Sequence, residues 1–163
     1  MKELKQVSDA VNKAVSYIGA ACFVVLIAAC VTQVFFRFVL NNSLSWTEEL
    51  ARYAFIWMHL MGASLLIGDG GHAAVTAILD ILHGVPRKMV EILIELVILF
   101  DGAVMVYAGG SLSWASRTNL STALSVPMWC VNSSVAVGGV LLILQAVVKL
   151  LVILGDEKKE ETK

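Results

Sequence analysis

Charged residues are scarce in this sequence. Of its 163 residues, 15% are Asp, Glu, Lys or Arg, against roughly 25% in an ordinary soluble domain. Hydrophobic residues make up 58% of the chain, and the mean hydropathy is +0.81. This composition excludes a water-soluble fold of this size, and the net charge of -1 gives no indication of a nucleic-acid partner.

Paired cysteines are also absent. Cys22, Cys30 and Cys130 each fall inside an apolar run, and none belongs to a C-x-x-C motif. We interpret them as small packing residues. A four-span disulfide exchanger, which needs paired cysteines in its loops, is therefore excluded.

The motifs of enzymes and cofactor sites are missing as well. No nucleophile triad, zinc site or phosphate-binding loop can be recognised, so we expect neither catalysis nor a cofactor. His59 lies in the middle of an apolar run, but a b-type haem needs a second axial His at a matching depth. His72 and His83 both lie in a surface segment, which disfavours a redox anchor with a haem Soret band.

Four apolar runs are long enough to cross a bilayer, which takes about 20 residues. They cover residues 17–39, 50–67, 87–108 and 127–149. Because the backbone must satisfy its own hydrogen bonds in lipid, these runs are predicted to be helices. The predicted fold is an all-α integral membrane protein with four transmembrane helices. Residues 1–154 form one membrane domain, in which residues 1–16 are a short amphipathic lead-in, and residues 155–163 form a charged cytoplasmic tail.

The distribution of Lys and Arg predicts the orientation of the chain. Four spans place the N-terminal tail, the second loop and the C-terminal tail on one side of the membrane. That side carries nine of the twelve Lys and Arg residues, and the other side carries Arg37, Arg52 and Arg117. Since cytoplasmic loops are enriched in positive charge, both ends are predicted to lie in the cytoplasm.

The second loop contains a segment that is amphipathic but too short to span. Its apolar positions follow helical spacing: Val75, Ile78, Leu79 and Leu82. The opposite stripe is polar: His72, Thr76, Asp80 and His83. We therefore predict an interfacial helix over residues 72–83, ended by Gly84 and followed by Pro86 at the start of the third span.

A cluster of charges lies at the boundary between the first two spans. Arg37 ends the first span, and Glu48, Glu49 and Arg52 begin the second, just after the boundary residue Trp46. Arg52 lies four residues from Glu48 and three from Glu49, so either acid can meet it on one helix. Three interpretations stay open: a salt-bridge cluster that fixes the hairpin, a docking site for another membrane subunit, or a transport-ion site.

The third span carries three acids. Glu91 lies four residues after Arg87 and can pair with it. Glu95 lies about 12 Å deeper than Arg87 at 1.5 Å per residue, and Asp101 is deeper still, on another face. Both are expected to meet polar groups of a partner or of the other spans. A proton relay would need acids or His on several helices, and the first and fourth spans offer none.

The boundary between the first two spans also carries a recognisable block. Residues 37–52 read RFVLNNSLSWTEELAR, which resembles the signature of the small membrane subunit of tripartite ATP-independent periplasmic (TRAP) transporters, the DctQ family. Three further features are similar: Phe55-Ile56-Trp57 with Gly62, Gly71-His72, and Pro127-Met128-Trp129 at the start of the last span. Family members usually carry an acid four residues after the His, where this chain has Thr76. Asp80 lies one turn further on the same stripe.

The resemblance implies an accessory role in the bacterial cytoplasmic (inner) membrane. The small subunit would form a stable heterodimer with a large multi-span transport subunit and brace it during sodium-driven uptake of a small organic acid. A periplasmic solute-binding protein would deliver the solute and bind transiently. Nine residues are assigned to the partner interface or to structure: Arg37, Trp46, Glu48, Glu49, Arg52, His72, Asp80, Glu95 and Asp101.

A self-sufficient four-span exporter that acts as a homodimer is the alternative. Such exporters typically use an acid in their first span. Here the first span offers only Gln33 and Arg37. Transport by the isolated chain would distinguish this alternative from the accessory role.

Overall fold

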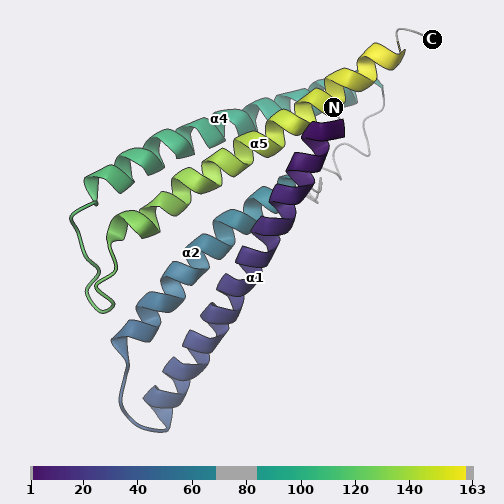
Figure 1. The fold of residues 1–163 in the computed structure, drawn as a ribbon. Coiled ribbons are helices and arrows are strands. Elements are labelled where there is room, and N and C mark those ends of the chain that lie inside the picture. Colours follow the sequence, from purple (N-terminus) through teal and green to yellow (C-terminus); the bar gives the residue numbers. More distant parts are fainter. Residues whose placement is uncertain (1, 69–83, 161–163) are drawn as a thin grey trace.

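The computed structural model describes residues 2–68 and 84–160 of the chain. Within these ranges there are four helices: α1 (Lys2–Phe38), α2 (Ser45–Gly68), α4 (Val85–Ala115) and α5 (Met128–Glu160) (Figure 1). The all-helical prediction is confirmed for this part of the chain. The predicted interfacial helix over 72–83, with His72 and Asp80, lies outside the described residues.

Helix α1 is longer than the first predicted span. The lead-in over residues 1–16 is not a separate element, because from Lys2 it continues without a break into the apolar run. No proline interrupts residues 2–38, so nothing in the covalent chain ends the helix there. At 1.5 Å per residue α1 is about 55 Å long, which exceeds the hydrocarbon core of a bilayer.

Within residues 2–68 and 84–160, three helices are long and apolar enough to cross a membrane. The qualifying stretches are Ser8–Phe38, Ser45–Ile67 and Met128–Ile153, which overlap three of the predicted spans. Helix α4 has 31 residues but is not among the three, and it carries Glu91, Glu95 and Asp101. The chain is thus a multi-pass membrane protein.

The start of α4 follows the predicted signals. Gly84 precedes it with a φ of 72°, a left-handed conformation that costs glycine little. Pro86 lies in the first turn, where its missing N–H would have had no helical partner. The second predicted loop therefore ends where the sequence indicates.

The helices form an open row. Among the described residues, α2 packs against both α1 and α5, α4 packs against α5 alone, and α1 touches α5 only over a small area. Figure 1 shows two hairpins, α1–α2 and α4–α5, that lie closest near the N-terminus. We call the end with loops 39–44 and 116–127 the loop end, and the opposite end the terminal end. Since the row does not close into a bundle, no other described element covers its outer apolar faces.

Glycines bring α4 and α5 into close backbone contact. A Cβ on Gly109 would lie 2.5 Å from the backbone nitrogen of Ala136, and one on Gly139 would lie 2.7 Å from the carbonyl oxygen of Gly102. In lipid, helices gain little by burying apolar side chains, so small residues that allow close approach hold them together. Serines serve the same purpose at Ser64 and Ser134, which are 1% exposed and hydrogen-bond within their own helices.

Replacement of adjacent glycines should give effects of opposite sign. Gly109→Ala is expected to lower the free energy of unfolding by about 1–3 kcal/mol, because the methyl group meets the backbone of α5. Gly110→Ala is the matched control, since nothing lies within 4 Å of its Cβ position. It should raise stability by up to about 1 kcal/mol through helix propensity. Unfolding in mixed micelles measures both, and equal effects would contradict the glycine contact.

Candidate functional site

Glu49 holds the loop between α4 and α5 against the start of α2. Its side chain is 9% exposed. Oε1 accepts a hydrogen bond from the Tyr53 hydroxyl at 2.5 Å, and Oε2 accepts the backbone N–H groups of Ala123 and Leu124, each at 2.9 Å. Three donors to one carboxylate make a strong set, because a hydrogen bond to a charged acceptor is stronger than one between neutral groups. This arrangement, the Glu49 tie, joins the two hairpins at the loop end.

The loop over residues 116–127 is ordered by its own hydrogen bonds. The Ser121 N–H donates to the Val126 carbonyl at 2.9 Å, and the Met128 N–H donates to the Asn119 carbonyl at 2.9 Å. In return, the Val126 N–H donates to Ser121 Oγ at 3.0 Å. Ala123 and Leu124 lie at the tip of this small ladder. Their N–H groups are therefore presented together to the Glu49 carboxylate.

The other boundary charges remain on the surface. Arg52 Nη2 donates to Glu48 Oε1 at 3.0 Å, and the side chains are 64% and 63% exposed. Arg37 makes no ion pair with the described residues, and its guanidinium lies 5.8 Å from the ring centroid of Phe38. Trp46 is 40% exposed. The predicted cluster is thus divided: Glu49 is used inside the chain, whereas Arg37, Glu48 and Arg52 stay accessible.

Glu95 is buried and forms an ion pair with a partly exposed lysine near the terminal end. It is 3% exposed, and its Oε1 lies 3.3 Å from Nζ of Lys149 on α5. Its Oε2 has no hydrogen-bond partner among the described residues. The sequence led us to expect that Glu95 meets a polar group of a partner or of another span, and Lys149 on α5 is a group of the second kind.

A chain of polar side chains continues from this pair to α1. Gln145, one turn before Lys149, is 3% exposed. It donates to Asn12 Oδ1 and accepts a hydrogen bond from Ser8 Oγ at 3.0 Å. These contacts tie α1 to α5 across the row, at the opposite end from the Glu49 tie.

The remaining acids of α4 differ in their surroundings. Glu91 pairs with Arg87 at 3.0 Å, as predicted. Asp101 is exposed and makes no hydrogen bond or ion pair with the described residues. Six residues after Glu95, it lies about 120° away from it around the helix axis. The two acids therefore face different surroundings, as the sequence predicted.

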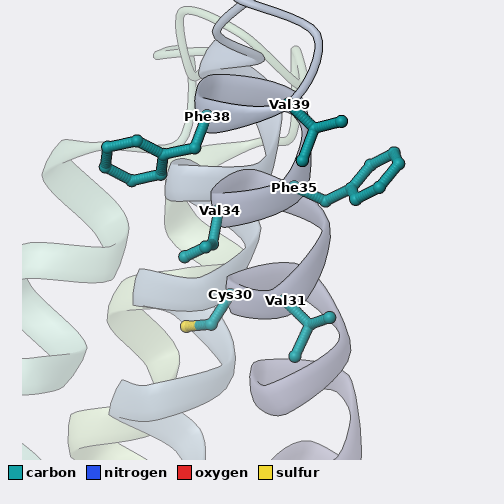
Figure 2. Close-up of a pocket in the computed structure, with 6 residues that line it drawn as sticks. All are labelled: Cys30, Val31, Val34, Phe35, Phe38 and Val39. Atoms are coloured by element: carbon teal, nitrogen blue, oxygen red, sulfur yellow. The ribbon is translucent and has the colours of Figure 1, made fainter.

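An apolar groove follows the loop end of α1. Figure 2 shows the six residues that line it: Cys30, Val31, Val34, Phe35, Phe38 and Val39. None of them carries a charge or a strong hydrogen-bonding group. A small organic acid needs several placed polar groups, so this groove suits acyl chains or an apolar helix and not a polar solute.

Comparison with known proteins identifies the family. The family model of the tripartite ATP-independent periplasmic transporters, DctQ component, matches residues 26–155. The chain belongs to the DctQ family. This result confirms the resemblance seen in the residue 37–52 block. The DctQ chain is a small accessory subunit of a TRAP transporter. The DctQ family consists of transporter membrane subunits and is not an enzyme family.

Several curated relatives of this DctQ chain are TRAP permeases. The sialic acid TRAP transporter small permease protein SiaQ of Vibrio cholerae is 28% identical over 149 residues, which cover 91% of this chain and 86% of SiaQ. A putative TRAP transporter small permease protein of Haemophilus influenzae is 24% identical over 59% of this chain and 60% of its own length. The sialic acid TRAP transporter permease protein SiaT of Haemophilus influenzae is 23% identical over 61% of this chain, but over only 16% of SiaT.

The Glu49 tie should contribute much more to stability than the neighbouring surface pair. Glu49→Ala is expected to lower the free energy of unfolding by about 2–4 kcal/mol, because three hydrogen bonds to a charged acceptor are lost. Tyr53→Phe removes one of them and should cost about 1 kcal/mol. Protease cleavage within residues 116–127 should accelerate in Glu49→Ala.

Glu48→Ala is the matched control for this experiment. Its exposed pair with Arg52 should contribute less than about 1 kcal/mol. Equal losses for Glu48→Ala and Glu49→Ala would contradict the assignment of Glu49 as the residue that holds the loop.

Substitutions of the buried Glu95 and its partner Lys149 should be coupled in their effects on stability. Lys149→Met leaves the buried Glu95 carboxylate without its cation and is expected to cost about 1–3 kcal/mol, less than in a fully buried pair because the lysine is 38% exposed. The double variant Glu95→Leu with Lys149→Met should return to within about 1 kcal/mol of the natural chain. A double-variant cycle of unfolding free energies tests this, with Arg87→Met as the exposed-pair control. Additive losses would show that the pair does not interact.

Proposed function

We propose that this chain braces the large transport subunit of a TRAP transporter during ion-coupled uptake of a small organic acid. The observation that carries this proposal is the open row of helices. Its described polar groups mostly hold the row together, and its broad apolar faces are left uncovered. The groove along α1 is lined by apolar residues alone, so it does not suit a polar solute. Such a chain suits a fixed support better than a carrier.

The proposal includes four membrane spans, of which α4 is the third in chain order. At 1.5 Å per residue, the 31 residues of α4 extend about 46 Å, enough to cross a bilayer. Two of its three acids are neutralised by Arg87 and Lys149, which lowers the cost of inserting it. With four spans, the distribution of Lys and Arg supports an orientation in which both ends of the chain lie in the cytoplasm. The proposed membrane is the bacterial inner membrane. The interfacial helix over 72–83, with His72 and Asp80, belongs to the same proposal.

The partner is proposed to be the large multi-span transport subunit, in a stable heterodimer. The match to SiaT supports this pairing. A stretch similar to most of this chain occupies 16% of that permease, so there a unit of this kind is continuous with a much larger membrane polypeptide. Arg37, Trp46, Glu48 and Arg52 are available at the loop end for contacts with the partner or, transiently, with a periplasmic solute-binding protein.

The proposed solute is a small organic acid, with sodium as the coupling ion. Two of the relatives carry sialic acid in their names. Sialic acid is therefore the first solute to test, and a dicarboxylate is the second.

Reconstitution tests the accessory role. We expect a tag on this chain to retain a co-expressed large transport subunit in about equal amounts. Proteoliposomes with both subunits, given the solute-loaded binding protein and an inward sodium gradient, should accumulate labelled solute. Vesicles with either subunit alone should show no uptake above background. Uptake or efflux by this chain alone, or full activity of the large subunit without it, would overturn the proposal.

A further inference from the structure

Asp101 occupies an unusual place for a carboxylate. It lies near the middle of α4, between Val85 and Ala115, on a helix that contacts α5 alone among the described elements. Its neighbours on the uncovered side are apolar and exposed: Val97 at 59%, Phe100 at 72% and Val104 at 47%. The carboxylate itself is exposed and has no partner within the described residues.

Such a carboxylate cannot simply face lipid without cost. Ionisable groups in the middle of a membrane are rare, and they pair with one another or face a protein interior. The other two acids of α4 obey this rule, since Arg87 meets Glu91 and Lys149 meets Glu95. The described part of this chain therefore supplies no cation to balance the Asp101 carboxylate.

We propose that the Asp101 face of α4, made of Val97, Phe100, Asp101 and Val104, docks on a helix of the large transport subunit that presents Arg or Lys at the same depth. This inference rests on the proposed function and adds to it the surface and the chemistry of contact. Charge complementarity selects the occupant, because a cation balances the carboxylate where lipid cannot. A second copy of the chain has no described Lys or Arg near the middle of a span.

Substitutions at Asp101 distinguish a docked carboxylate from a lipid-facing one. Asp101→Glu keeps the charge and should retain the large subunit at the natural level. Asp101→Asn and Asp101→Leu leave the partner's cation unpaired and should reduce the co-purified large subunit about tenfold or more. Since Asp101 makes no hydrogen bond or ion pair with the described residues, the amount of membrane-inserted small subunit should not change.

A lipid-facing Asp101 gives the opposite result. Replacement by Leu would then remove a charge from lipid, and the variant would insert and co-purify as well as the natural chain or better. That outcome would overturn the proposal. If Asp101→Asn and Asp101→Glu retained equal amounts of the large subunit, the assignment of a cationic partner residue would be overturned.

Photocross-linking in the natural Asp101 background supplies a second test. A benzoylphenylalanine at Val97 or Val104 should form adducts with the large subunit. The control position is Val24 on α1, which is 66% exposed and lies at the other edge of the row. The docking face is refuted if the two subunits co-purify but adducts form only from Val24. It is also refuted if Val97 forms adducts between two small subunits. In both cases the accessory role stands. Failure of the two subunits to co-purify at all would instead refute the proposed function.

Discussion

Within a bilayer, a helix gains little by exchanging lipid for the apolar side chains of another helix. Close backbone contact and polar ties must hold these helices together instead. The chain uses both: Gly102, Gly109 and Gly139 bring α4 onto α5, and two polar arrangements join the hairpins. The Glu49 tie acts at the loop end, and the Ser8, Asn12 and Gln145 contacts act at the terminal end. Fixed at both ends, the open row is suited to a support that does not change shape during transport.

Short-range features of this structure could be predicted from the sequence. The apolar runs gave the helices, Gly84 and Pro86 gave the start of α4, and i,i+4 spacing gave the pairs Glu48–Arg52 and Arg87–Glu91. Each of these depends on residues that are neighbours on one helix or in one turn. The residue 37–52 block was enough to indicate the family, because its residue types and order are specific even where their contacts are unknown.

Long-range contacts could not be read in the same way. Glu49 meets backbone amides 74 and 75 residues later, and backbone donors have no sequence signature. Spacing alone made Glu49 and Glu48 equivalent partners for Arg52, yet one is buried and the other exposed. The pairing of Glu95 with Lys149 depends on the register between α4 and α5, which is set by glycine contacts and not by charge patterns. Residues 1–16 differ in composition from the first span, which predicts a separate lead-in. The helical backbone of α1 nevertheless runs through both without a break.

The Glu49 tie has a consequence for biogenesis. The chain emerges from the ribosome in order, so α2 is made before residues 123 and 124 exist. Until the loop over 116–127 has been synthesised, the Glu49 carboxylate has only Tyr53 of these donors. The hydrogen bonds of the first hairpin are therefore completed only when the loop of the second hairpin has been made and has folded against it.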